Sequence, residues 1–450
     1  MEKLQSSMPR AAAKLDAACR TISACFRTAV AAFLLSALIQ SSGLQAQPQG
    51  YELERIEIDN AEDLLDLLED PIDFVDIVLA PGEYRLDDPE LMQDRLAALE
   101  YALHLSGEHL NIGAENSGTV KIVVEARHGL RFERCRQCSM RNLDLLVKPA
   151  FNPADTLTFV SIVESDVDIL SSTFKLDAAP PSEDSANESV VNALQAAAGG
   201  RAAINGNSFI AFNGSAIIVS DDARATLRDN LIDGATIVDQ AASQTAAPGE
   251  GRARRVRGES AAVLLKDNAT GQLKNNLIQH CYKGVGIRDN ADGIVKDNII
   301  ERISTWGVAL WQTGAQSPVG LIQHNVIYHT GACGAMISLT GFEDELGLFN
   351  DNLLVKTGQD ERLDAAELFC YQSPLAGHAV PEGFDISGNI MYANRAGDAT
   401  LPDLDVDGEV FERELASFCE FFQRREQIRD NSEFVRLLCN LEPGTFGRGE

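Results

Sequence analysis

The stretch from Lys274 to Trp311, KNNLIQHCYKGVGIRDNADGIVKDNIIERISTWGVALW, contains the same short pattern twice. Asn276 and Asn298 each have a hydrophobic residue three positions before them and another two positions after them. The complete pattern recurs at seven asparagines: Asn207, Asn230, Asn276, Asn298, Asn325, Asn352 and Asn389. A repeat of this length is typical of a solenoid, in which each coil buries its apolar side against its neighbours.

The spacings between these asparagines are 23, 46, 22, 27, 27 and 37 residues. The 46-residue spacing is twice 23, so either a coil without asparagine or a long loop follows Asn230. Two apolar columns around a polar corner predict two short strands that meet at a bend, where asparagine tolerates a left-handed backbone. Stacked asparagine side chains are expected to hydrogen-bond along the solenoid.

The repeat resembles the right-handed parallel β-helix of the pectate-lyase-like superfamily, over roughly residues 100–395. The resemblance implies an all-β solenoid with an N-terminal helical cap. Lyases, hydrolases, epimerases and non-catalytic adhesins share this fold, so the fold alone does not identify the chemistry.

The sequence divides into four predicted parts. Residues 1–46 predict a secretory signal peptide, because five basic residues precede the apolar run 29–39 and small residues follow it. An uncleaved membrane anchor is the alternative for this segment. Residues 47–100 predict the N-terminal cap, 101–399 the parallel β-helix and 400–450 a C-terminal helical segment, which reads as two helices. The protein is therefore expected to be secreted or periplasmic, with no stable membrane span after signal cleavage.

The chain is strongly acidic. Its formal net charge is −29, and removing the five basic and two acidic residues of the signal segment changes this to −32. Such a charge argues against nucleic acid and anionic lipid as partners. A polyanionic substrate would need a local basic site or bound cations.

Seven cysteines remain outside the signal segment: Cys135, Cys138, Cys281, Cys333, Cys370, Cys419 and Cys439. An exported protein permits disulfides, and the odd number leaves at least one free thiol or an intermolecular bond. The Cys135–Cys138 spacing provides too few ligands for a zinc site.

Aligning the second strand of each coil places Lys266 and Arg288 in one column. The resemblance implies that a substrate cleft runs along this sheet, with Lys266, Arg288 and Trp311 on its floor and Trp306 entering from a turn. Tryptophan rings stack on sugar rings, and paired cations neutralise a uronate carboxylate and acidify its α-proton. Lys266 and His329 are the first candidates for the base of the resulting β-elimination. The alternative for both tryptophans is coil packing.

Two further basic features are candidates for substrate binding. His280, Arg302, His329 and Lys356 each stand four positions after a repeat asparagine, which predicts a stacked basic column. The segment PGEGRARRVRGES contributes an arginine loop that includes Arg254 and Arg255. A solvated turn and a flexible basic loop are the simpler interpretations of these two features.

Asp221, Asp267 and Asp289 form an acidic column beside Lys266 and Arg288. Carboxylates attract Ca²⁺, so Asp267 and Asp289 are candidate ligands for calcium, the one cofactor that the sequence suggests. Aspartate is also an ordinary corner residue of such repeats.

These observations favour a secreted β-helix protein that acts on an acidic polysaccharide by β-elimination. Two alternatives stay open: a non-catalytic carbohydrate-binding or surface protein, and a glycoside hydrolase or epimerase on the same fold. No complete catalytic signature of a lyase or hydrolase family is present.

Overall fold

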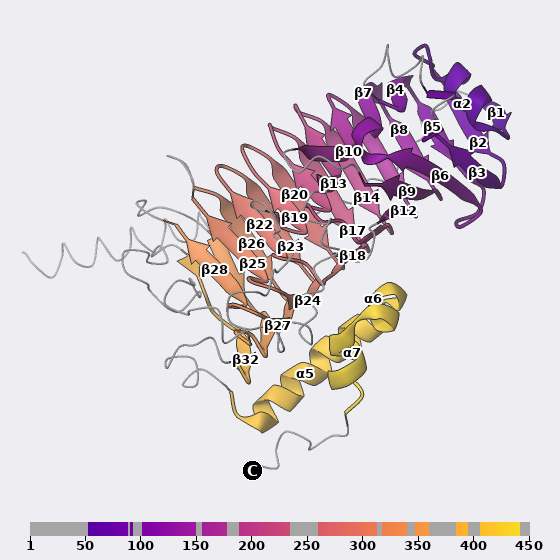
Figure 1. Ribbon diagram of the computed structural model, residues 1–450. Helices are drawn as coiled ribbons and strands as arrows, with labels where there is room; N and C mark the ends of the chain where they lie inside the picture. Colours follow the sequence, from indigo (N-terminus) through magenta and orange to yellow (C-terminus); the bar gives the residue numbers. More distant parts are fainter. Residues whose placement is uncertain are drawn as a thin grey trace, which may run out of the picture. The chain divides into compact units, whose positions relative to one another are not determined.

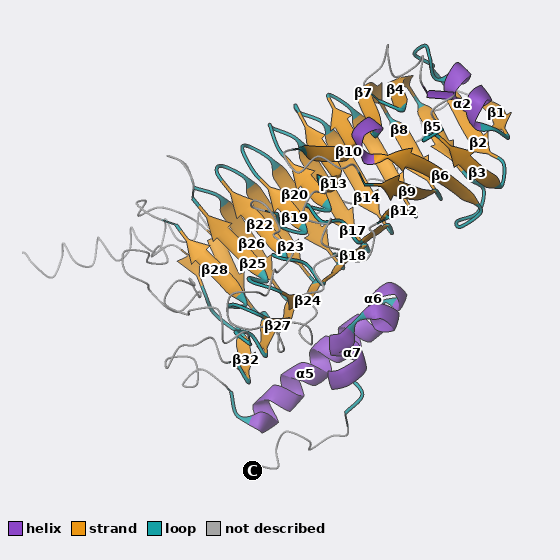
Figure 2. Ribbon diagram, viewed as in Figure 1, coloured by secondary structure: helices purple, strands orange, loops and turns teal. Residues whose placement is uncertain are grey.

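A computed structural model describes residues 53–88, 91–92, 101–149, 155–177, 189–234, 260–312, 317–339, 347–359, 384–394 and 406–441. The predicted signal peptide lies outside these residues. Strands dominate the described chain, and its helices lie within residues 61–128 and 408–438 (Figure 2).

The strands of the described residues form three parallel sheets, named here sheets A, B and C (Figure 1). Each coil passes from sheet A to sheet B and then to sheet C, so each strand pairs with strands one coil before and after it. Sheet A contains β1 (Glu54–Ile58), β2 (Val75–Leu79), β5 (Leu110–Gly113), β8 (Cys138–Arg141), β11 (Asp166–Leu170), β14 (Arg201–Asn205), β17 (Arg224–Arg228), β20 (Thr270–Lys274), β23 (Asp292–Lys296), β26 (Val319–Gln323), β29 (Gly347–Asn350) and β31 (Phe384–Asp385).

Sheet B contains β3 (Gly82–Arg85), β6 (Val120–Glu125), β9 (Asp144–Lys148), β12 (Thr173–Leu176), β15 (Ser208–Ile210), β18 (Leu231–Asp233), β21 (Leu277–Gln279), β24 (Ile299–Ile303), β27 (Val326–Thr330), β30 (Leu353–Val355) and β32 (Ile390–Tyr392). Sheet C contains β4 (Leu103–Glu108), β7 (Leu130–Arg136), β10 (Thr156–Val163), β13 (Val190–Ala197), β16 (Ile217–Val219), β19 (Val263–Leu265), β22 (Val285–Arg288), β25 (Val308–Trp311) and β28 (Ala335–Ser338). The protein is therefore a right-handed parallel β-helix, as the sequence predicts.

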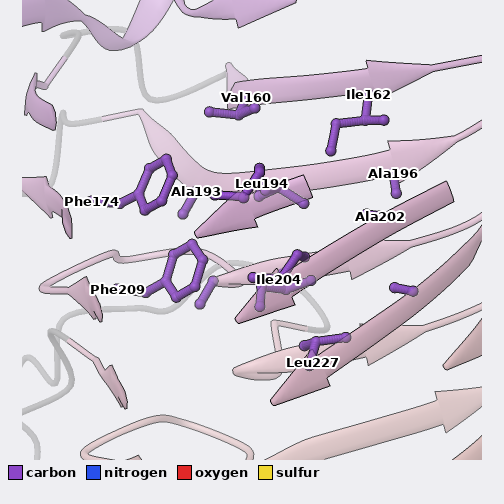
Figure 3. Packing of buried hydrophobic residues seen from close by; sticks show 14 of the residues in the cluster. Val160, Ile162, Phe174, Ala193, Leu194, Ala196, Ala202, Ile204, Phe209 and Leu227 are labelled. Atoms are coloured by element: carbon purple, nitrogen blue, oxygen red, sulfur yellow. The ribbon is translucent and has the colours of Figure 1, made fainter. Parts of the chain in front are cut away.

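The core lies between the three sheets and is filled by equivalent residues of successive coils. Ile204 on β14 pairs with Leu227 on β17, and both side chains are fully buried. On sheet B, the rings of Phe174 and Phe209 stack with centroids 4.8 Å apart (Figure 3). Apolar columns that run from coil to coil along the sheets therefore supply the burial that a single coil lacks.

The asparagine ladder forms as predicted. Asn298 Nδ2 donates to Asn325 Oδ1 at 3.0 Å, and Asn276 Nδ2 donates in turn to Asn298 Oδ1 at 2.9 Å. The same side-chain link joins all seven asparagines, from Asn207 through Asn230, Asn276, Asn298, Asn325 and Asn352 to Asn389. Each amide of the ladder from Asn207 to Asn352 is fully or almost fully buried, so these bonds satisfy groups that water does not reach.

The bend itself is made by a different residue from the one expected. The left-handed position is the residue just before each ladder asparagine: Gly206, Asp229, Asn275, Asp297, His324, Asp351 and Gly388. The preceding residue turns the chain, and the asparagine side chain is thereby free to point along the stack. The prediction that the ladder asparagine adopts the left-handed conformation is wrong.

The 46-residue spacing contains no additional coil. Asn230 Nδ2 donates directly to Asn276 Oδ1 at 2.9 Å, and β18 pairs with β21 in register. Asn230 and Asn276 therefore belong to successive coils, although residues 235–259 separate the two strands.

The coils begin closer to the N-terminus than the predicted boundary at residue 101. Strands β1, β2 and β3 already belong to sheets A and B. Helix α2 (Ala61–Leu67) follows β1, with Asn60 accepting a hydrogen bond from the Asp63 amide at its start. Residues 53–85 thus combine the expected helix with the first coil, and a short 3₁₀ helix, η1 (Ala126–His128), precedes β7.

Three C-terminal helices cover the outer face of sheet B (Figure 1). They are α5 (Gly408–Gln423), α6 (Glu426–Asn431) and α7 (Glu433–Leu438). Their apolar side chains share one cluster with outward residues of sheet B, including Ile299, Val326 and Tyr328. The sequence predicts two helices at this position. The described residues contain three, because the second predicted helix is divided into α6 and α7.

A buried carboxylate anchors this helical segment. Glu301 on β24 accepts hydrogen bonds from the Ser432 hydroxyl at 2.9 Å, the Glu433 amide at 2.7 Å and the Phe434 amide at 2.9 Å. Burial raises the pKa of Glu301, and the three donors oppose that rise. The adjacent Arg302 forms two hydrogen bonds to Glu433, so one strand holds the start of α7 through two side chains.

Disulfides join Cys135 to Cys138 and Cys419 to Cys439. Cys333 is also disulfide-bonded, whereas Cys281 is a buried free thiol. The second disulfide connects the C-terminal part of α5 to the residue after α7. Among the described cysteines, the predicted free thiol is therefore Cys281.

Candidate functional site

The C-terminal ends of three neighbouring strands of sheet C carry, at equivalent positions, Lys266, Arg288 and Trp311. Arg288 pairs in register with Trp311, and Lys266 directly follows Leu265, the partner of Ile287. The column of Lys266 and Arg288 aligned from the sequence is thus confirmed, and Trp311 extends it by one coil.

A lysine surrounded by aromatic rings lies on the same face. Lys283 Nζ is 5.2 Å from the ring centroid of Trp311, 5.5 Å from that of Trp306 and 5.7 Å from that of Tyr282. All three distances permit cation–π attraction. Trp306 and Trp311 therefore come together through Lys283, which the sequence did not single out.

The floor beneath these rings is apolar. Ile218 and Leu264 point outward from sheet C and form a cluster with Ala261, against which Trp311 packs. Gly286 makes room for the ring, since a Cβ at this position would lie 3.0 Å from Trp311 Cη2. In the described part of the chain, the buried Trp306 Nε1 has no hydrogen-bond partner, so it is a donor suited to a ligand.

Each cation of the column lies beside an acid of its own coil. Lys266 Nζ is 3.4 Å from Asp267 and Arg288 Nε is 3.5 Å from Asp289, with side chains 27% and 19% exposed. Asp267 and Asp289 both adopt a left-handed conformation, with φ of 61° and 60°. These aspartates therefore serve as corner residues and balance the charge of their neighbours.

The calcium prediction gains no ligand cluster from this geometry. Among the described residues, no group of three or more His, Cys, Asp or Glu side chains is arranged to hold a metal ion. Asp267 and Asp289 provide only two carboxylates, and each already lies beside a cation. We therefore assign no chemical step to calcium.

The basic column of His280, Arg302, His329 and Lys356 stacks as predicted, at or just after the ends of the strands of sheet B, where the chain leads to sheet C. Each of these residues has a left-handed backbone, with φ between 52° and 54°. The strands of sheet C are parallel. The basic column lies before the first residues of these strands, whereas Lys266 and Arg288 lie at their C-terminal ends. The structure therefore does not bring His329 together with Lys266 and Arg288.

The basic column instead contacts neighbouring acids and the C-terminal helices. His280 Nδ1 is 2.8 Å from Asp233 Oδ1, and this hydrogen bond raises the pKa of His280. Burial, aided by the charge of Arg302, lowers the pKa of His329 to about 4. His329 is consequently neutral at pH 7, and Arg302 is engaged with Glu433 of α7.

A small cavity lies among the segments that connect sheet B to sheet C in neighbouring coils. Its volume is about 10 Å³, and its lining includes Asp233, Ser260, Cys281 and Tyr282. This space is sufficient for about one water molecule and too small for a sugar ring. Burial raises the pKa of Cys281 to about 12, so the thiol there is not a nucleophile at neutral pH.

The predicted arginine loop, with Arg254 and Arg255, lies outside the described residues. Lys283 and Tyr282 are the site residues that the sequence analysis missed. A usable signal existed, because aligning Val285 with Val308 places Lys283 opposite Trp306. The alignment from repeat asparagines concentrated on strand ends and did not extend to the residues before each strand.

A comparison with known protein families agrees with this fold. Residues 186–352 match a family model described as a right handed beta helix region. No curated protein sequence matches the chain. A PL6 alginate lyase solved in complex with a trisaccharide is 14% identical, with a TM-score of 0.41, over 71% of this chain and 64% of that chain. This chain therefore spans less than two thirds of the length of that lyase.

Two other solved structures show similar resemblance. The catalytic domain of a GH87 α-1,3-glucanase in complex with tetrasaccharides is 9% identical, with a TM-score of 0.42, over 80% of this chain and 68% of that chain. A PL6 family polysaccharide lyase from Pseudopedobacter saltans is 11% identical, with a TM-score of 0.33, over 78% of this chain and 95% of that chain.

The three parallel sheets, the ladder and the family model together define a right-handed parallel β-helix repeat protein. Of the helices in the described ranges, none is both long and apolar enough to cross a membrane.

Proposed function

We propose that the outer face of sheet C binds an acidic polysaccharide and cleaves it by β-elimination. The observation that carries the proposal is the position of Lys283 near the rings of Trp306 and Trp311, on the sheet where Trp311 pairs in register with Arg288 of the preceding coil. The two rings offer stacking surfaces for sugars, and the cations suit the carboxylate of a uronate. A local basic site is what a chain with net charge −29 needs to attract an acidic glycan.

The proposed chemistry follows from the order of residues along the column. Arg288 binds the uronate carboxylate and stabilises the negative charge that develops when the α-proton leaves. Lys266, one coil away, accepts that proton in its uncharged amine form. The bond to the leaving sugar oxygen then breaks to give an unsaturated product, and water protonates the leaving oxygen. His329 has no role in this step, because it stands at the other end of the strands.

The proposal also places the protein outside the cytoplasm. Cys135–Cys138 and Cys419–Cys439 are oxidised pairs, which persist in oxidising compartments. These bonds support the predicted signal peptide and a secreted or periplasmic location. N-terminal sequencing of the exported protein is the direct test, since cleavage after Ala46 leaves Gln47 as the first residue.

The function is tested with Arg288→Ala and a panel of uronate oligosaccharides, while the absorbance of the unsaturated product is followed with and without a chelator. We expect Arg288→Ala to reduce turnover by about 100-fold or more, as loss of a transition-state donor does elsewhere. Arg136→Ala is the matched control, because Arg136 is 79% exposed at the far end of sheet C.

Calorimetry at two ionic strengths distinguishes a lyase from a binding protein. Tight salt-sensitive binding without any product would favour the non-catalytic alternative. Equal binding of a short uronate oligosaccharide by the wild type and Arg288→Ala, or a preference for neutral glycans, would contradict the site.

A further inference from the structure

The outer face of sheet A carries a second concentration of positive charge. Arg201 and Arg224 pair in register at the starts of β14 and β17. At the other ends of these strands, Arg228 pairs with Lys274 of β20, and Lys274 pairs with Lys296 of β23. These five residues, named here the basic face, thus form two rows that run along the solenoid.

The side chains of the basic face point away from the core. The intervening residues Ile204, Leu227 and Leu273 are buried in the core, so strand alternation turns their charged neighbours outward. Arg201, Arg224, Lys274 and Lys296 are exposed, and Arg228 is half-buried. The face is therefore accessible to a large partner.

Little of this charge is neutralised. Lys274 Nζ is 3.7 Å from Asp297 Oδ2, which is its one ion pair among the described residues. No described acid lies within ion-pair distance of Arg201, Arg224, Arg228 or Lys296. Cations stacked at the ~4.8 Å spacing of neighbouring strands repel one another, so the arrangement costs stability unless an anion binds.

A sixth cation reaches the same edge from a distant part of the chain. Arg425, between α5 and α6, donates from Nε to Asn275 Oδ1 at 3.0 Å, next to Lys274. Its guanidinium carbon also lies 4.3 Å from the centroid of Phe421, which fixes the side chain over α5. The C-terminal segment thereby extends the row of Arg228, Lys274 and Lys296.

The space between the rows is narrow and neutral. Ala203, Thr226 and Gln272 occupy the middle positions of their strands, and the rows stand about 13 Å apart across four residues. Acids lie on both sides of the row of Arg201 and Arg224, with Asp166 one coil before Arg201 and Asp292 one coil after Thr270. The face is thus a bounded strip a few coils long.

We propose that this strip binds a linear acidic polysaccharide whose carboxylates lie along the two rows of cations. The ~4.8 Å rise per coil is close to the length of one pyranose residue, so successive charges of the polymer meet successive coils. An acidic peptide fits less well, because every strand of the strip is paired on both sides and offers no backbone groups for strand addition.

The surface is independent of the site on sheet C, and only the choice of a uronate polymer as partner rests on the proposed function. A polymer that binds both surfaces gains effective concentration, so long chains should bind more tightly than short ones. The strip would then hold the polymer while a separate part of it enters the site on sheet C.

The test compares a triple variant, Arg228→Gln with Lys274→Gln and Lys296→Gln, with a control triple, Lys121→Gln with Arg136→Gln and Lys175→Gln. The control removes equal charge from sheets B and C. Calorimetry with polygalacturonate and with trigalacturonate measures binding. We expect the basic-face triple to lose about tenfold in affinity for the polymer, and the control triple to lose much less.

Two further readouts separate this proposal from the function of sheet C. The basic-face triple should keep its turnover of trigalacturonate and resist urea at least as well as the wild type, because repulsion is relieved. Arg288→Ala should lose turnover but keep binding of polygalacturonate to the basic face. If no variant shows turnover, the binding measurements still decide the present proposal.

Three outcomes would overturn it. Unchanged polymer affinity in the basic-face triple would show that the strip does not bind the polymer. An equal loss in the control triple would assign the effect to net charge. Polyglutamate that binds as tightly as polygalacturonate, with the same loss in the triple, would show that the strip does not select a glycan.

Discussion

Asn298 shows how one buried amide connects neighbouring coils. Its Nδ2 donates to Asn325 and to the carbonyl oxygens of Leu273 and Lys296, while its Oδ1 accepts from Asn276. Every polar atom of the side chain is thereby satisfied in a place that water does not reach. A buried group that loses such partners costs more than an exposed one, because the neighbours are left unsatisfied too.

Asn298→Ala should therefore destabilise the fold by about 2–4 kcal/mol, since it leaves donors and acceptors of three coils unpaired. Lys296→Ala, two residues earlier and exposed, should change stability by less than about 0.5 kcal/mol. Urea unfolding of both variants measures the difference. Equal free energies of unfolding would mean that the ladder bonds contribute nothing to stability.

His280 and His329 occupy the same column but should respond oppositely to pH. The folded pKa of His329 is lowered to about 4, mainly by burial. An unfolded histidine titrates near 6.5, so the unfolded state takes up the proton first and stability falls as the pH drops from about 6.5 to about 4. The loss should be about 1–2 kcal/mol, because solvent screens part of the shift at this partly exposed ring.

The pKa of His280 is raised by its hydrogen bond to Asp233, so its contribution is fully present below pH 6.5. That contribution is lost as the pH rises through the folded pKa. Unfolding free energies of His329→Gln and His280→Gln across this range check both signs. His329→Gln should make the unfolding free energy less dependent on pH below pH 6.5, and His280→Gln should do so above pH 6.5. Parallel plots of unfolding free energy against pH for the wild type and both variants would refute the assignment.

At the scale of elements, the C-terminal helices show why sheet B can be apolar on both sides. Leu277, Ile299 and Val326 point away from the core, yet they are fully buried because α5, α6 and α7 cover them. His324 joins this contact through its ring, which stacks on Phe418 at a centroid distance of 4.6 Å. The helices therefore complete the fold of sheet B, although they come after the last coil in the chain.

Glu301→Gln should weaken this docking, because the amide group cannot accept all three hydrogen bonds that Glu301 receives from the start of α7. We expect a loss of about 1–3 kcal/mol in the unfolding free energy. Faster hydrogen exchange in residues 433–438 would localise the effect. Glu409→Gln on the exposed first turn of α5 is the control, and equal exchange in both variants would rule out the anchoring role.

At the scale of the whole molecule, the sequence predicts what depends on the repeat and misses what depends on distant segments. The ladder and the column of Lys266 and Arg288 follow from spacing, because register carries each residue onto its equivalent one coil away. The pairing of Arg302 with Glu433, 131 residues apart, has no such rule. The prediction that His329 lies beside Arg288 was wrong for a related reason. The spacing of the repeat assigns each residue to a position in its coil, but it does not show which other side chains lie next to that residue.

The distribution of charge is also a property of the whole molecule. The two residues before Asn230, Asn276 and Asn298 read RD, KN and KD, so the sequence already contains the row of Arg228, Lys274 and Lys296. The row escapes notice because each cation looks like an ordinary surface residue of one strand. Only the stacking of coils turns three separate residues into one surface.

The direct link between Asn230 and Asn276 has a consequence for how such a protein changes over generations. Strand β18 meets β21, and β16 meets β19, although residues 235–259 intervene in the chain. The pitch of the solenoid is thus decoupled from the length of the connections between its strands. New sequence can be added at such a connection without refolding the support, so a recognition module can be exchanged or grafted there while the frame beneath it keeps its dimensions.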